Sequence, residues 1–189
     1  MATEVVYETH STSVDNERGI ATGWLDGELS ARGREQAREL GRRRRHDGIS
    51  AVYASDLGRA VETAEIAFGG TDFPVRYDPR LRECDYGDLN GAPVDEVATV
   101  RRRHVDEPFP RGESYREVVE RMRAFLDDVA VRHDGERVVV IAHSANRWAL
   151  DHLVHGTPLE ELVDAPFQWQ EGWLYVLSAN ASRSASDIE

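Results

Sequence analysis

The chain has 189 residues, of which 40% are hydrophobic and 31% charged, and its formal net charge is -12 at pH 7. Its single cysteine, Cys84, excludes a disulfide framework and any zinc or iron–sulfur site that needs several cysteines. No apolar run reaches the roughly 18 residues of a membrane-spanning helix, and the amino-terminal stretch lacks the pattern of a secretory signal. We therefore expect a cytoplasmic protein with no membrane partner.

The acidic balance also bears on the partners of the protein. A strongly negative surface opposes nonspecific nucleic-acid binding, so no nucleic-acid partner is expected. All 23 basic residues are arginines, and because this bias is global, genome composition explains it more simply than function. The same negative charge repels phosphorylated substrates. Any phosphate chemistry would therefore require a locally positive pocket.

Strands and helices are expected to alternate along the chain. β-Branched and apolar runs predict strands, and Ser N-caps with apolar spacing predict helices, over 5–9 (strand), 30–46 (helix), 49–54 (strand), 57–68 (helix), 73–77 (strand), 94–104 (helix), 114–132 (helix), 137–142 (strand), 145–155 (helix) and 173–177 (strand). The unbroken run at 138–141 is typical of a buried parallel strand. The order predicts an α/β three-layer sandwich with a mostly parallel central sheet and helices on both faces. One domain is expected over 1–179, followed by a Ser-rich, disordered tail over 180–189.

Polar side chains follow several of these strands. His10 follows the first strand, Ser55 the second, with Arg59 about one turn into the next helix, and His143 follows the buried strand. Ligands of open α/β sheets bind outside the carboxyl ends of the strands. We therefore expect these side chains to face one crevice. Glu83, after the third strand, is a further candidate.

Each candidate also has a purely structural explanation. A histidine after a strand is most often a hydrogen-bonded loop residue, and Glu83 alone would be a surface carboxylate. Arg59 could pair with Glu62 or Glu65 on its own helix. Their coincidence at one edge of the sheet favours a functional site.

A series of segments adds a family resemblance to this pattern. They are THSTSVDN at 9–16, ATGWL at 21–25, LSARGREQARELG at 29–41, YASDLGRAVETAE at 53–65, LRECDYGDLNG at 81–91, RGES at 111–114 and VVVIAHSANRWAL at 138–150. In this order and with this spacing, the chain from about residue 5 to 178 resembles the histidine phosphatase superfamily, also called phosphoglycerate mutase-like. The resemblance implies that fold.

The resemblance also implies a role for each candidate. His10 would attack phosphorus as a neutral imidazole and form a phosphohistidine. Arg59 would clamp the phosphoryl oxygens, and His143 would donate to them. Glu83 would protonate the leaving oxygen and then activate water. Further substrate contacts would come from Asn16, Thr22, Gly23 and the Ser144 backbone N–H, with no metal or other cofactor.

The sequence departs from the family pattern around the nucleophile. Thr9 stands where the family has an arginine, Ser11 where it has a glycine, and Glu8 where it is usually apolar. Loss of a charged phosphate contact should cost about 1.5–3 kcal/mol unless another group replaces it. Arg147, four residues after His143, is the first candidate to do so. Alternatively, Arg147 forms an ion pair with Glu8.

Other arginines are weaker candidates for this replacement. They are Arg18, Arg82 and Arg111. The runs at 42–45 and 101–103 are expected to be solvated faces, although 101–103 could rim the pocket.

The function expected is a metal-independent phosphomonoesterase that acts on a small phosphorylated metabolite. The short segment over 85–112 favours hydrolysis over a phosphoglycerate mutase reaction. The Thr9 substitution motivates a third alternative, a degenerate binder of phosphorylated ligands. A metal site formed by His10, His143 and Glu83 is opposed by Arg59 beside it. The substrate and the oligomeric state stay open.

Overall fold

The computed structural model describes residues 1–177, so the tail expected at 180–189 lies outside the described residues. Its centre is a five-stranded sheet in the order β4-β3-β6-β1-β7. Four strands are parallel, and β7 runs antiparallel to β1 at one edge. The strands are β1 (Thr3–Thr9), β3 (Ile49–Ala54), β4 (Val75–Tyr77), β6 (Arg137–Ala142) and β7 (Trp173–Leu177).

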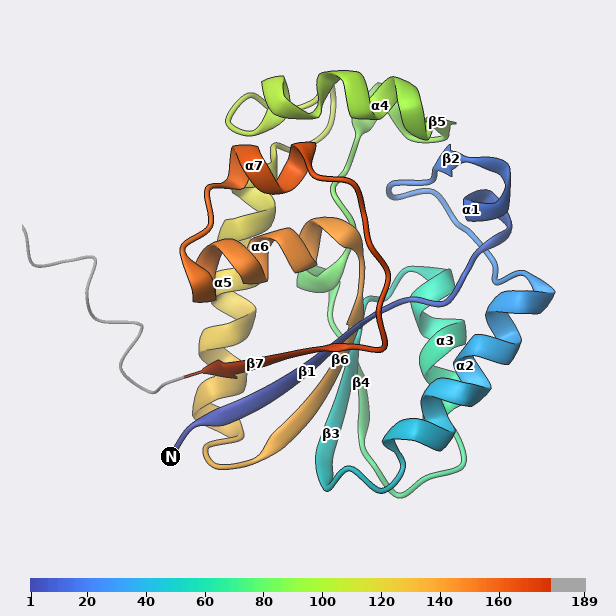
Figure 1. The fold of residues 1–189 in the computed structure, drawn as a ribbon, viewed down its shortest axis with the longest axis vertical. Helices are drawn as coiled ribbons and strands as arrows, with labels where there is room; N and C mark the ends of the chain where they lie inside the picture. The colour runs from blue at the N-terminus through green and yellow to red at the C-terminus, as the bar shows by residue number, and fades with distance from the viewer. Residues whose placement is uncertain (178–189) are drawn as a thin grey trace, which may run out of the picture.

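Helices cover both faces of the sheet (Figure 1). One face carries α2 (Ala31–Arg44) and α3 (Gly58–Phe68), and the other carries α5 (Tyr115–Arg132) and α6 (Ser144–His155). Successive strand residues point to opposite faces, so Val6 joins the core under α2 and α3 while Val5 and Tyr7 join the core under α5 and α6. The predicted three-layer sandwich with a mostly parallel sheet is confirmed.

The register of the central strands brings their following residues together. Thr9, the last residue of β1, pairs with Ala142, the last residue of β6. The His10 backbone N–H donates to the Ala142 carbonyl at 2.9 Å, which continues this pairing by one residue. His10 and His143 therefore leave the sheet side by side.

Helix α2 packs closely on the loop that follows β1. It begins after Ser30, whose hydroxyl accepts a hydrogen bond from the Gly33 N–H. A Cβ at Gly33 would lie 1.9 Å from the Thr12 carbonyl oxygen, so only glycine allows this approach. One turn later, the Gln36 side chain accepts from the Thr12 N–H at 3.0 Å. These contacts fix the loop that carries His10.

The remaining elements are short and differ most from the sequence expectations. The helix expected over 94–104 breaks into α4 (Val94–Val100) and a 3-10 turn, η3 (Arg101–His104). The sequence pattern did not predict several short elements, which are α1 (Val14–Arg18), β2 (Ile20–Ala21), β5 (Ala92–Pro93), α7 (Leu159–Asp164) and the 3-10 turns η1 (Pro79–Leu81) and η2 (Gly87–Leu89). Such elements are too short to show hydrophobic periodicity. None of the helices in the described part is long and apolar enough to cross a membrane.

Candidate active site

A cavity of about 480 Å³ opens beyond the carboxyl ends of β1, β3 and β6. Most of the residues singled out in the sequence line it, namely Thr9, His10, Asn16, Thr22, Gly23, Arg59, Glu83 and Ser144. His143 is fully buried, and its ring centroid lies 5.0 Å from that of His10. The structure thus brings all of these positions to one site, and leaves Arg147 outside the cavity lining.

The His10 ring is held in one tautomer. Its Nδ1 lies 2.8 Å from the Ser11 backbone carbonyl oxygen, which can only accept, so Nδ1 carries the proton. Desolvation by the surrounding protein, and then the Arg59 charge, lower the pKa of His10 to about 3. At neutral pH the ring is therefore uncharged, and Nε2 keeps its lone pair. This is the state required of a nitrogen nucleophile.

His143 is buried without partners for its ring. Both ring nitrogens lack a hydrogen-bond partner among the described residues, and the side chain is 0% exposed. Burial first, and then the Arg59 charge, hold the pKa of His143 well below its usual value. The Tyr7 hydroxyl donates to the His143 backbone carbonyl and so fixes the main chain here. Unpaired buried polar groups are costly, and a ligand that accepts a hydrogen bond from the ring would relieve this cost.

Arg59 is buried in the first turn of α3. Its Nη2 donates to the Gly23 carbonyl at 2.9 Å, and its Nη1 donates to the Leu25 carbonyl at 3.3 Å. Glu62 instead pairs with Arg34 at 2.6 Å. The two carbonyls orient the guanidinium on the cavity without neutralising its charge, so an anion can still bind to it.

Glu83 is a buried carboxyl group rather than a surface carboxylate. Its Oε1 accepts from the Cys84 N–H at 2.8 Å and from the Ala145 N–H at 3.2 Å. Burial raises the pKa of Glu83, against the lowering effect of these N–H groups and of Arg59. The group therefore holds its proton to a higher pH than an ordinary glutamate, which suits a general acid.

The loop after β2 contributes Thr22 and Gly23. The Thr22 hydroxyl donates to Asp15 at 2.9 Å, which leaves its oxygen as an acceptor. Gly23 has φ +56°, and a Cβ there would lie 1.8 Å from the Asn90 side-chain oxygen. Glycine is thus required at the position whose carbonyl holds Arg59. On the other side of the loop, the Asn16 side chain accepts from the Ser13 N–H at 2.9 Å in a capping box.

Both expectations for Arg147 are wrong. Its Nη1 lies 3.4 Å from Asp151, one turn later on α6, and its guanidinium carbon lies 5.1 Å from the centroid of the Trp173 ring. Glu8 pairs with Arg44 at 2.8 Å and with Arg43 at 3.4 Å. The direction of α6 carries Arg147 away from the cavity and toward β7.

The weaker candidates do not replace the missing arginine either. Arg82 pairs with Asp56 at 2.6 Å, and Arg111 pairs with Asp88. Arg18 is exposed and does not line the cavity. None of these three arginines lines the cavity.

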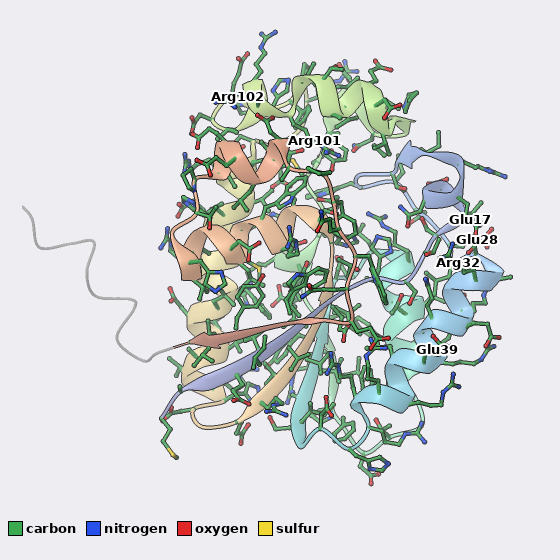
Figure 2. The ribbon with its side chains drawn as sticks, in the orientation of Figure 1. Glu17, Glu28, Arg32, Glu39, Arg101 and Arg102 are labelled. Atoms are coloured by element: carbon green, nitrogen blue, oxygen red, sulfur yellow. The ribbon has the colours of Figure 1, made fainter. Side chains whose placement is uncertain are left out.

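Two further arginines line the cavity, Arg101, from the run at 101–103 that could rim the pocket, and Arg32, which the sequence did not single out. Arg32 lies at the amino-terminal end of α2, and Arg101 lies on η3 (Figure 2). The Arg101 Nε is buried without a hydrogen-bond partner among residues 1–177, and its guanidinium carbon lies 5.2 Å from the centroid of the Trp148 ring. Arg102 instead pairs with Asp164 as an exposed residue. Arg32 precedes Gln36, another residue of the cavity lining, by one helical turn.

The alternative metal site is not formed by the described residues. Between residues 1 and 177, no group of three or more His, Cys, Asp or Glu side chains could hold a metal ion. His10, His143 and Glu83 therefore do not form a ligand set. Positive charge reaches the cavity from Arg59, Arg32 and Arg101 instead.

Comparisons with known proteins show what this chain is similar to. A model of the histidine phosphatase superfamily (branch 1) matches residues 9–185. A 2,3-bisphosphoglycerate-dependent phosphoglycerate mutase from Methylobacterium sp. (strain 4-46) is 32% identical over 97% of this chain and 96% of its own length. Phosphoserine phosphatase 1 from Hydrogenobacter thermophilus is 31% identical over 84% of this chain and 79% of its own. The solved structure of Bacillus stearothermophilus YhfR, 31% identical, has a TM-score of 0.80 over 91% of this chain and 90% of that one.

Proposed function

This chain belongs to the histidine phosphatase superfamily, and from that premise we propose that it is a metal-independent phosphomonoesterase acting on a small phosphorylated metabolite through a phosphohistidine. One observation carries the proposal, the pair of neutral imidazoles with ring centroids 5.0 Å apart. His10 has a fixed tautomer with an unprotonated Nε2, and the two ring nitrogens of His143 have no hydrogen-bond partner within residues 1–177. A phosphoryl group between them would meet a nucleophile and a hydrogen-bond donor.

In the first step of the proposed reaction, the phosphoryl group moves to the enzyme. The lone pair on Nε2 of His10 forms a bond to phosphorus while the bond from phosphorus to the leaving oxygen breaks. Glu83 gives its proton to that oxygen, so an alcohol leaves and a carboxylate remains. The Nδ1–H of His10 stays bonded to the Ser11 carbonyl, which supports the positive charge that develops on the ring.

In the second step, water removes the phosphoryl group. The Glu83 carboxylate takes a proton from water as the water oxygen forms a bond to phosphorus. The phosphorus–nitrogen bond breaks, and its electron pair returns to Nε2 of His10. Phosphate leaves, and Glu83 is protonated again for the next cycle.

Charge neutralisation is the main demand of phosphoryl transfer, and arginines supply it here. Arg59 would take the central contact. Arg101, whose Nε has no hydrogen-bond partner in the described part of the chain, would replace the family arginine that is Thr9 here. Ser144 is the first residue of α6 and lines the cavity, so its N–H would bind a phosphoryl oxygen at a helix amino terminus, which favours anions. Asn16 and Thr22 would add polar contacts at the rim.

A phosphoglycerate mutase activity is the second candidate. The relative that matches 97% of this chain carries that name. Such an enzyme would return the phosphoryl group from His10 to a second substrate hydroxyl rather than to water. The two activities differ in product, because hydrolysis releases inorganic phosphate and the mutase reaction yields an isomeric phosphoester.

A screen of phosphorylated metabolites with and without EDTA tests the proposal. We expect inorganic phosphate to be released at the same rate in both conditions. Acid quenching with labelled substrate should trap an acid-labile, base-stable phosphoryl group in the wild type and none in the His10→Ala variant. Inactivation by EDTA that added Mg²⁺ or Zn²⁺ reverses would overturn metal independence. No turnover of any substrate would favour the degenerate binder.

A further inference from the structure

An extended segment, residues 165–172, connects α7 to β7 (Figure 1). It places two large aromatic side chains, Phe167 and Trp169, on the lining of the active-site cavity. Phe167 is 43% exposed and Trp169 is 56% exposed. Large aromatic side chains left open to water beside a pocket mark a surface that is covered when a ligand binds.

Hydrogen bonds from Arg44 connect the carboxyl-terminal end of this segment to the buried Glu8 side chain. Arg44 donates from Nε to Glu8 at 2.8 Å and from Nη2 to the Glu171 backbone carbonyl at 2.8 Å. A Cβ at Gly172 would lie 2.3 Å from Arg44 Nη2 and 2.9 Å from a Glu8 carboxylate oxygen. The chain therefore passes directly over the ion pair. Trp169 borders the small groove that Glu8 and Thr9 also line.

The Phe167 side chain packs against the aromatic side chain of Trp173. The Phe167 ring lies 6.4 Å, centroid to centroid, from the Trp173 ring at the start of β7. Trp173 in turn lies 6.2 Å from the Tyr7 ring and under the Arg147 guanidinium. Arg147 therefore packs on the Trp173 ring, which in turn contacts Phe167. Phe167 therefore packs on Trp173, and the hydrogen bond from Arg44 fixes the backbone two residues after Trp169.

We propose that Phe167 and Trp169 form a leaving-group subsite that takes a flat, apolar ring of the substrate, and that Glu8 and Arg44 are positioning residues for it. This inference rests on the proposed phosphatase function. The cavity of about 480 Å³ lies within the range of about 300–1,000 Å³ typical of small-molecule sites and exceeds the needs of one phosphoryl group. The arginines and histidines of the cavity serve the phosphoryl end.

The chemistry of the subsite favours a ring over a polar leaving group. Phe167 offers only apolar and π surface, and Trp169 offers one N–H donor. A polyol or a carboxylate would lose hydration at these faces with few partners in return. A ring gains both apolar burial and stacking there.

Two esters with leaving groups of similar basicity test the subsite, 2-phenylethyl phosphate and ethyl phosphate. The wild type should show a kcat/KM about tenfold higher for the ring ester, since stacking and burial add to its binding. Phe167→Ala and Trp169→Ala should each lower this ratio toward unity. Tyr77→Ala, which removes an equally exposed aromatic residue outside the cavity, should keep it.

The positioning role has its own variant and control. Arg44→Met removes the contacts to Glu8 and to the Glu171 carbonyl, so the ratio should fall by about threefold or more. Arg45→Met, on the neighbouring exposed arginine, should preserve the ratio. A lower folded fraction changes both esters equally and leaves the ratio unchanged. An unaltered ratio in Arg44→Met would overturn the positioning role.

A binding experiment separates failure of this inference from failure of the proposed function. The non-hydrolysable 2-phenylethylphosphonate and ethylphosphonate are titrated into the wild type and Trp169→Ala by calorimetry. Tighter binding of the ring compound to the wild type alone supports the subsite, even if neither ester is hydrolysed. Hydrolysis of both esters with equal kcat/KM, and equal phosphonate affinities, would overturn the subsite and leave the phosphatase standing.

Discussion

Two groups of polar side chains lie at the end of β1, one around Glu8 and the other around His10. They differ in whether their polar atoms have hydrogen-bond partners. Glu8 is 3% exposed, and its carboxylate accepts from Arg44 at 2.8 Å and from Arg43 at 3.4 Å. Beyond the strand end, the His10 ring lies beside His143, whose two ring nitrogens have no partner among the described residues.

Glu8 is thus a buried group that stabilises the fold, whereas His143 is a buried group whose ring nitrogens can bind a ligand. A buried charge with good partners is retained because removing either partner leaves the other uncompensated. A buried imidazole without partners costs stability, and binding recovers that cost. Residues of the first kind should therefore affect unfolding most, and residues of the second kind should affect turnover most.

The largest expected effect is on turnover at His10. His10→Ala should lower kcat by at least about 10³-fold, because no other group would carry the phosphoryl intermediate. Its unfolding free energy should change by less than about 1 kcal/mol, because the ring makes one local hydrogen bond. Phosphate release and urea denaturation measure the two effects. Retention of more than a few per cent of activity would contradict the covalent mechanism.

Glu83→Gln should have the next largest effect, with a size that depends on the leaving group. We expect a loss of about 10²–10⁴-fold in kcat/KM for an alkyl phosphate, whose leaving oxygen needs a proton. The loss for p-nitrophenyl phosphate should be much smaller where attack on phosphorus limits that reaction. Equal losses for both substrates would show that Glu83 only positions the ligand.

The pH profile of the same variant sharpens this result. Activity requires Glu83 protonated and His10 neutral, so the raised pKa of Glu83 sets the basic limb. The acidic limb follows His10, whose pKa is about 3. Glu83→Gln should lose the basic limb for alkyl substrates and keep the acidic one. A basic limb that persists would belong to another group.

Glu8→Ala should act mainly on stability. The change leaves the partly buried Arg44 and Arg43 guanidinium groups without their shared carboxylate, although Arg44 keeps its ion pair with Asp47, so unfolding free energy should fall by about 1–3 kcal/mol. Urea denaturation of the variant measures this loss. Glu39→Ala, which removes an exposed carboxylate 3.7 Å from Arg42, is the matched control and should cost less than about 1 kcal/mol. Similar losses in both variants would contradict the contrast between the clusters.

The smallest effect concerns Arg101, which we propose as the replacement for the family arginine that is Thr9 in this chain. Arg101→Met should lower kcat/KM about 10- to 100-fold, mainly through KM, because one charged contact to phosphate is lost. Arg102→Met, on the adjacent exposed side chain labelled with it in Figure 2, should change kcat/KM less than about twofold. If Arg101→Met leaves kcat/KM unchanged, the replacement role would pass to Arg32, which also lines the cavity.

The sequence by itself determined the sheet and the position of the candidate site. The strands at 49–54, 137–142 and 173–177 were predicted with the bounds that the structure shows. Their signals are local, because β-branched runs bounded by turn residues need no knowledge of distant partners. Parallel strands then bring their carboxyl ends to one edge, which is why His10, Arg59, Glu83 and His143 could be placed together before the fold was known.

Only the tertiary structure decided which arginines serve that site. A guanidinium stands on a long, flexible side chain, so its direction depends on how its helix packs. Arg101 and Arg102 are neighbours on η3, yet Arg101 lines the cavity and Arg102 lies on the exterior. In the same way, Glu8 finds Arg44 because α2 packs against β1 across many residues of sequence. Spacing along the chain, which suggested Arg147, carries no information about such contacts.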